Sequence, residues 1–158
     1  MAIKLAQQYG IPAIRCFAER KRGALRLLRR YPRATKAVLR QLLNSCVLTR
    51  VSRGWTGELE RAGVVRASDF YGVTATGFLD EETLREILSG LREGTSELMC
   101  HPGLVDDDLR RTPTRLVGQR EMEFQALTSP AIKLLARDLG IELVNYRDVV
   151  HANLDAVV

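Results

Sequence analysis

The stretch TSELMCHPG, residues 95–103, determines the expected fold because it has the pattern of a buried strand that ends abruptly. The apolar run at 98–100 is short enough for such a strand, whereas Pro102 cannot donate a hydrogen bond to a sheet and Gly103 permits a sharp turn. His101 is therefore predicted at the end of the strand, which is the edge where active sites of parallel α/β folds lie. A lone histidine at this point is also compatible with a purely structural, hydrogen-bonded role.

Helical and strand patterns alternate on both sides of this stretch. Apolar spacing predicts helices over residues 3–9, 34–50, 55–62, 81–91, 119–126 and 130–139. Strands are predicted over residues 11–16, 68–72, 96–101 and 141–146, followed by a short terminal helix or tail. Strands that alternate with helices imply a mainly parallel sheet with right-handed crossovers, and four strands amount to half a barrel.

Local signals mark where several of these elements begin and which way they face. Asp80 is a predicted N-cap, and Ser129-Pro130 supplies an N-cap followed by a proline in the first helical turn. The polar stretch 106–113, with three consecutive aspartates, predicts a solvated loop rather than a cation site because it lacks EF-hand spacing. In the helix over 34–50, an apolar face is predicted from Val38, Leu42, Leu43, Cys46 and Val47.

The composition is that of one globular domain. Of 158 residues, 46% are hydrophobic and 27% are charged, which predicts a single α/β domain over residues 1–150 and a tail over 151–158. No apolar run reaches the roughly 18 residues that span a bilayer, and no signal-peptide pattern is present, so a cytoplasmic location without membrane contact is expected. Three cysteines without CxxC spacing predict reduced thiols, and two histidines cannot build a histidine-rich metal site.

Charge is distributed unevenly along the chain. Up to Arg66 there are 15 Lys or Arg against 3 Glu, a surplus of +12, whereas the remainder carries 9 against 16, a deficit of −7. This predicts a basic helical insertion over about residues 19–66. A solvated arginine-rich face or an interdomain face is favoured over a nucleic-acid site, because few aromatic residues are interleaved and no DNA-binding motif is present. Motifs for nucleotide binding, zinc proteases and serine hydrolases are also absent from the sequence.

An ordered set of motifs carries a resemblance to a known family. The motifs are LAQQYGIPAIR (5–15), DFYG (69–72), ELMCHPG (97–103), QREMEFQALTSP (119–130) and GIEL (140–143). They resemble the YdjC-like carbohydrate deacetylases, which include chitooligosaccharide deacetylase and the hopanoid-associated deacetylases. The resemblance covers most of residues 3–147 and is weakest in the basic region over 19–66.

The resemblance implies a TIM-like (β/α) barrel that removes N-acetyl groups from oligosaccharides with a divalent metal, Mg or Zn. In that family the metal is held by an early aspartate motif and by histidines that precede the helix with which this sequence begins. The chain is therefore expected to be the C-terminal part of such a barrel, to lack all metal ligands, and to be inactive alone. The DFYG motif at 69–72 follows the 11–16 segment and does not correspond to the aspartate motif.

Two family positions map onto this sequence as candidate catalytic residues. His101 resembles the general acid that protonates the leaving amine, a task that suits imidazole because its ordinary pKa lies near neutrality. Arg15 resembles a residue that orients a catalytic carboxylate, although Phe17 stands where the family usually has proline. Glu121 and Glu123 are predicted to be solvated or ion-paired, and His151 to lie on the surface.

Two other functional classes remain open on the sequence alone. In the first, the chain is a non-catalytic binding module whose basic half contacts nucleic acid or another anionic polymer. In the second, it associates as a homo-oligomer or with a complementary N-terminal half, because half a barrel leaves open sheet edges and an apolar face.

Overall fold

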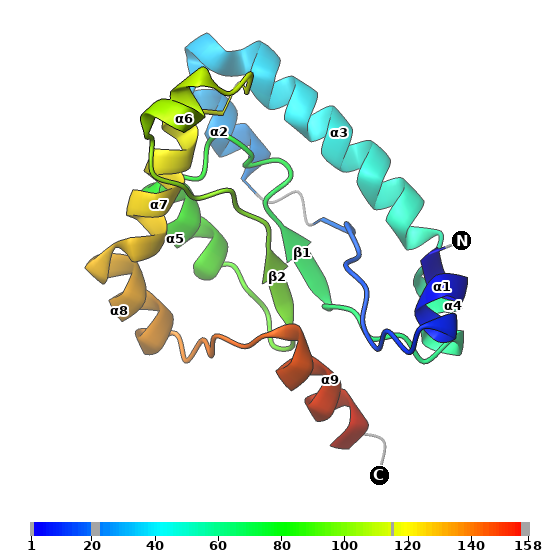
Figure 1. The fold of residues 1–158 in the computed structure, drawn as a ribbon. Helices are drawn as coiled ribbons and strands as arrows, with labels where there is room; N and C mark the ends of the chain where they lie inside the picture. Colours follow the sequence, from blue (N-terminus) through cyan, green and yellow to red (C-terminus); the bar gives the residue numbers. More distant parts are fainter. Residues whose placement is uncertain (1, 20–22, 115, 156–158) are drawn as a thin grey trace.

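A computed structural model of the chain describes residues 2–19, 23–114 and 116–155. Its elements, in chain order, are α1 (Ala2–Gln8), α2 (Ala24–Arg30), the 3-10 turn η1 (Pro32–Ala34), α3 (Thr35–Arg53), α4 (Thr56–Arg61), β1 (Asp69–Tyr71), α5 (Glu81–Leu88), β2 (Ser96–Leu98), α6 (Asp107–Arg111), α7 (Gly118–Thr128), α8 (Pro130–Asp138) and α9 (Tyr146–Asp155). The described fold is therefore a mostly helical α/β arrangement. The β1–β2 pair lies between two groups of helices, with α5–α8 on one side and the long helix α3 on the other (Figure 1).

The two strands pair in parallel, as the alternating pattern predicts. Asp69, Phe70 and Tyr71 of β1 lie opposite Ser96, Glu97 and Leu98 of β2. Gly72, directly after β1, has a φ of +113°, and a Cβ atom placed on it would lie 2.2 Å from the carbonyl oxygen of Met99. The chain can therefore hold the two strand ends this close only with glycine at position 72.

The strand predicted over 11–16 is wrong, although its position beside the sheet is correct. This segment makes only an isolated parallel bridge between Ala13 and Val65, in which Ile14 N donates to Val65 O at 2.9 Å and Val65 N donates to Pro12 O at 2.8 Å. Pro12 has no N–H to extend the ladder. A second bridge joins Glu19 to Phe70 of β1.

The strand predicted over 141–146 is also wrong. Among the described residues this segment finds no neighbouring strand, and Leu143 remains 90% exposed. Its last residues instead begin α9, where Asn145 Oδ1 accepts a hydrogen bond from Arg147 N at 2.8 Å. An apolar run forms a strand only where a partner supplies hydrogen bonds, so the run here stays an extended connection.

Most predicted helices are confirmed. Asp80 caps α5 by accepting a hydrogen bond from Thr83 N at 2.7 Å, and Pro130 occupies the first turn of α8. The hydroxyl of Ser129 makes no cap and instead donates to Glu81 Oε2 at 2.8 Å. The loop predicted over 106–113 is partly wrong, because Asp106 accepts from Leu109 N at 2.8 Å and thereby starts the short helix α6.

Two separate clusters of buried apolar side chains are found among the described residues. The larger one joins α5, α7 and α8 to the strand ends through Ala75, Leu79, Leu84, Ala126 and Ile132. The smaller one packs α1 against α4 through Ala6, Leu59 and Val64. None of the described helices is both long enough and apolar enough to cross a membrane.

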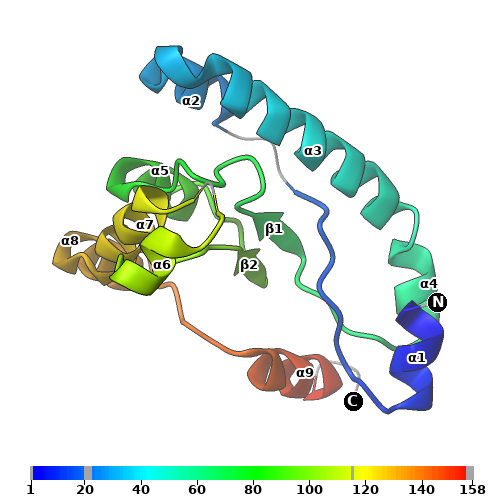
Figure 2. The ribbon, with the colours of Figure 1, turned by 45° about the horizontal axis from the view of Figure 1, so that its top comes forward.

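The face that helix α3 turns inward differs in part from the one that the sequence predicts: Val38 is buried as predicted, and Leu42 and Cys46 are partly buried. Its buried row is mostly polar and consists of Val38, Gln41, Ser45, Thr49 and Ser52. Leu43 and Val47, predicted to point inward, are 63% and 56% exposed. Figure 2 shows α3 along the outer edge of the molecule, with α2 at one end and α4 at the other.

The polar row of α3 is attached to the rest of the molecule through Glu19. This buried carboxylate accepts hydrogen bonds from the hydroxyl of Ser45, from Gly72 N at 2.9 Å, and from the hydroxyl of Thr74 at 2.7 Å. It also accepts from Thr74 N at 3.0 Å. Glu19 thus links the basic segment to the loop that follows β1.

Part of the positive charge of the basic segment is neutralised within the fold. Arg30 of α2 lies 2.7 Å from Glu82 and 2.9 Å from Glu86, both on α5, and 3.5 Å from Asp80. Although burial favours the neutral form, hydrogen bonds from Tyr31 and Thr83 and the charge of Arg30 lower the pKa of Asp80 below its ordinary value. Burial and the hydrogen bond to Asp80 raise the pKa of Tyr31.

Candidate functional site

His101 lies three residues beyond the end of β2, on the side of the sheet that the sequence predicts. It borders a cavity of about 410 Å³ between α3 and the loops after the two strands. The lining residues are Phe17, Gln41, Asn44, Val47, Leu48, Val73, Thr76, Met99 and His101. The carboxyl ends of the parallel strands therefore open onto a concave site, as expected for this class of fold.

The backbone of His101 is held in place, whereas its ring is not fully engaged. Its N–H donates to the carboxylate of Glu123, and its carbonyl oxygen lies 3.5 Å from Arg120 Nη1. The ring atom Nδ1 is buried and has no hydrogen-bond partner among the described residues. An imidazole in this state can donate or accept a proton without first breaking a protein hydrogen bond.

Arg15 lies in a separate cluster that includes Glu97 of β2. Its Nε contacts Glu97 Oε1, and the other carboxylate oxygen accepts a hydrogen bond from the hydroxyl of Tyr146. The guanidinium also stacks 6.0 Å from the centre of the Phe70 ring. Burial and the bond to Glu97 raise the pKa of Tyr146.

The structure does not bring the two predicted residues into contact. Arg15 is 48% exposed at its side chain, and none of its interactions with described residues involves His101. The carboxylate that Arg15 contacts is Glu97, four positions before the histidine. Any influence of Arg15 on His101 therefore passes through β2 and the turn after it.

Cys100 lies beside His101 but is poorly suited to act as a nucleophile. Burial raises the pKa of its thiol, and the charge of Glu123 raises it further, against an opposing effect of Arg15. Within the described part of the chain, Cys16, Cys46 and Cys100 form no disulfide bond.

Glu123 is the main site residue that sequence reasoning misplaces. The sequence predicts that Glu123 is solvated or ion-paired. In the structure its side chain is 1% exposed and accepts a hydrogen bond from the backbone N–H of His101. A signal was present, because Glu123 shares a helix face with Ala126 and Leu127, both of which pack into the larger core. Glu97 carried no comparable signal, because alternate residues of a short strand give little information on burial.

The described residues do not fit a metal ion. They contain no group of three or more His, Cys, Asp or Glu side chains placed to hold one. Asp106 is occupied as a helix cap, and Asp108 is 91% exposed at its side chain and contacts Arg111.

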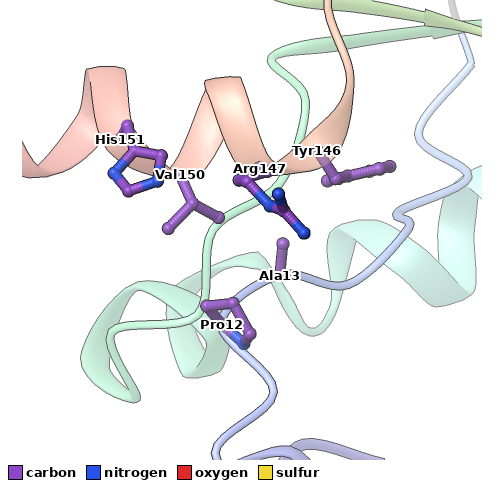
Figure 3. A pocket seen from close by; sticks show the side chains of 6 residues that line it. All are labelled: Pro12, Ala13, Tyr146, Arg147, Val150 and His151. Carbon is purple, nitrogen blue, oxygen red and sulfur yellow. The ribbon is translucent and has the colours of Figure 1, made fainter.

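A second cavity, of about 440 Å³, lies between α9 and the segment before the first bridge. Arg147 and Val150 extend from α9 toward Ala13 and Pro12, with His151 at the side (Figure 3). His151 is exposed, as predicted. This cavity lies apart from His101 and shares none of its lining residues with the first.

The chain is similar to known proteins, and each match covers only part of the relative's own length. A carbohydrate deacetylase of Thermoanaerobacter pseudethanolicus is 35% identical over 86 residues, which is 54% of this chain and 34% of that protein. A chitooligosaccharide deacetylase of Klebsiella pneumoniae is 34% identical over 97 residues, 61% of this chain and 37% of that protein. A carbohydrate deacetylase of Vibrio vulnificus is 39% identical over 62 residues, 39% of this chain and 24% of that protein. The chain thus spans about a third or less of these relatives.

No solved structure matches the chain. The model of the family described as YdjC-like protein matches residues 1–138, which include His101, Arg15 and the whole of the cavity between α3 and the strand ends. The chain belongs to the YdjC-like protein family.

Proposed function

We propose that this chain forms the C-terminal part of a TIM-like (β/α) barrel that deacetylates N-acetylated oligosaccharides. The observation that carries the proposal is the position of His101, which borders a cavity at the carboxyl ends of two parallel strands with a ring nitrogen unpartnered among the described residues. The similarity to carbohydrate and chitooligosaccharide deacetylases supports the same reaction class. The basic segment over residues 19–66 is an insertion in this barrel.

In this proposal His101 supplies the proton that the reaction needs. Hydrolysis of an acetamide leaves a sugar amine, which departs readily only after its nitrogen is protonated. The imidazole of His101 supplies that proton, and the backbone of this residue is held at the site by its hydrogen bond to Glu123. Arg15 is a positioning residue that acts on β2 through Glu97.

The divalent metal, Mg or Zn, that the family resemblance implies is not part of this assignment. Because the described residues contain no fitting ligand group, the role proposed for this chain is limited to binding and proton transfer. The chain alone is expected to release no acetate from chitooligosaccharides, with or without added Mg²⁺ or Zn²⁺. Release by the purified chain would contradict the assignment.

The experiment is a titration of the 158-residue chain with triacetylchitotriose, followed by NMR of the imidazole carbons. The chain has two histidines, so His101→Asn and His151→Asn assign the two signals and serve as matched variants. We expect the His101 signal to shift and the His151 signal to stay. Unchanged His101 signals at saturating sugar would overturn the proposal.

The alternative role in binding an anionic polymer has less support. Arg30 is engaged with acids of α5, and within residues 2–19, 23–114 and 116–155 no lysine or arginine lines the cavity beside His101. Salt-dependent binding to duplex DNA would restore this alternative.

A further inference from the structure

The wall of the His101 cavity that faces the strands comes from α3. This helix contributes Gln41, Asn44, Val47 and Leu48, whereas the strand side contributes Val73, Thr76, Met99 and His101. Although α3 belongs to the strongly basic half of the chain, no Lys, Arg, Asp or Glu occurs in the lining that the described residues form. A cavity lined by amides, a hydroxyl, an imidazole and apolar groups suits a neutral ligand with both polar and apolar parts.

Gln41 differs from the other polar residues in the buried row of α3. Ser45 donates to Glu19, Thr49 accepts from Glu19 N at 3.1 Å, and Ser52 accepts from Phe17 N at 3.1 Å. Gln41 is only 4% exposed and its side chain makes no hydrogen bond to the described residues, but its amide atoms are not among the fully buried polar atoms that lack a partner, so they remain accessible from the cavity. An amide in this position can hydrogen-bond to a ligand without first breaking a hydrogen bond within the protein.

The unpartnered Gln41 amide borders the same cavity as the unpartnered His101 ring. A primary amide offers one acceptor oxygen and two donor hydrogens. An acetamido group offers one N–H and one carbonyl oxygen, so the two groups can exchange a pair of hydrogen bonds. A free amine has no carbonyl oxygen and carries a positive charge near neutral pH, so it cannot form this pair.

We propose that Gln41 is a specificity-determining residue that binds an acetamido group of the sugar and thereby distinguishes acetylated from deacetylated oligosaccharide. The inference rests on the proposed function and adds a residue from the basic segment to the site. Phe17, Val73 and Met99 supply apolar surface for the acetyl methyl group and the sugar ring. Asn44, exposed and one turn from Gln41, lies at the mouth of the cavity.

The test compares the affinities of the whole chain for triacetylchitotriose and for the fully deacetylated trimer. Gln41→Met keeps the length of the side chain but removes the amide. We expect its affinity for the acetylated trimer to fall between about twofold and tenfold, as for loss of one or two hydrogen bonds, while its affinity for the deacetylated trimer is unchanged. Gln41→Glu should shift the preference toward the deacetylated trimer, because a carboxylate attracts its ammonium groups. The matched control is Gln125→Met on α7, an exposed glutamine outside the cavity, which should change neither affinity.

Stability provides a readout that separates ligand binding from a structural role. Because Gln41→Met removes an amide that is accessible from the cavity and makes no hydrogen bond to the described residues, it should change the melting temperature of the unliganded chain by less than about 2 °C while weakening binding. A lower melting temperature together with an unchanged ratio of the two affinities would show that Gln41 is structural and would overturn the inference. If the His101 signal shifts with sugar in wild type and the affinity ratio of Gln41→Met equals that of wild type, only this inference fails. If the wild-type His101 signal does not shift, the proposed function itself fails.

Discussion

Helices α5 and α3 lie on opposite sides of the β1–β2 pair and are attached to it by different kinds of side chain (Figure 1). α5 buries Leu84, which packs with α7 and α8 in the larger apolar cluster. α3 buries Val38 and a row of polar residues, several of which contact Glu19 or its neighbours, and exposes Leu39, Leu43, Val47 and Val51. Apolar packing tolerates small shifts, whereas hydrogen bonds fix direction, so the polar attachment positions α3 specifically and leaves one of its amides available at the cavity.

The strongest test of this difference removes the carboxylate on which α3 depends. Glu19→Ala leaves the Ser45 and Thr74 hydroxyls and two backbone N–H groups without their acceptor, and should lower the free energy of unfolding by about 3 to 5 kcal/mol. Urea denaturation measures the change. Glu58→Ala on α4, an exposed glutamate in the same half, should cost less than about 0.5 kcal/mol and is the control. Equal effects would show that Glu19 does not hold α3.

A pair of leucine truncations tests the apolar side of the comparison. Leu84→Ala opens a cavity in the larger core and should lower the free energy of unfolding by about 3 kcal/mol. Leu43→Ala on α3, where the side chain is 63% exposed, should cost less than about 0.5 kcal/mol in the same measurement. A comparable loss in both variants would mean that α3 also packs through its apolar row.

The contact between α2 and α5 predicts a dependence on pH. Because the pKa of Asp80 is lowered by folding, its stabilising effect is fully present above the ordinary value of 3.8 and is lost as the pH falls through the folded value. Asp80→Asn keeps a capping side chain but cannot ionise, and it should be about 1 kcal/mol less stable than wild type at pH 7. Denaturation from pH 7 downward should show this gap closing below pH 3.8. A gap that stays constant with pH would exclude the effect.

The smallest expected effect concerns the outward face of α3. Leu39, Leu43, Val47 and Val51 are each about half exposed or more, and β2 pairs only with β1 among the described residues. We predict weak self-association, detected by sedimentation as an average mass that rises with protein concentration. Leu43→Lys should reduce this rise, and a mass independent of concentration in the wild type would contradict the prediction.

The elements that the sequence predicts well are those with local signals. Asp80, the acids after it and the apolar spacing up to Leu88 are all contained in one segment, and α5 forms as expected. His101 was placed near the strand end by the adjacent Pro102 and Gly103. In both cases the information lies within a few residues of the feature.

The features that the sequence could not predict depend on distant residues. Glu19 becomes buried because it meets Ser45, Gly72 and Thr74, which are 26 to 55 positions away in the chain. The same contacts explain why α3 buries a mostly polar row. This row is an exception to the usual rule that the apolar face of a helix turns inward. The strand predicted over 141–146 fails for the opposite reason, because no described segment lies beside it as a partner.

The position of His101 depends on the lack of a side chain at Gly72. A Cβ atom at residue 72 would lie 2.2 Å from Met99 O, two positions before His101, and the positive φ is unfavourable for any other residue. Any replacement would force β2 away from β1 and carry the histidine with it. In a library of all single substitutions, position 72 should therefore accept glycine alone, although Gly72 does not line the cavity beside His101.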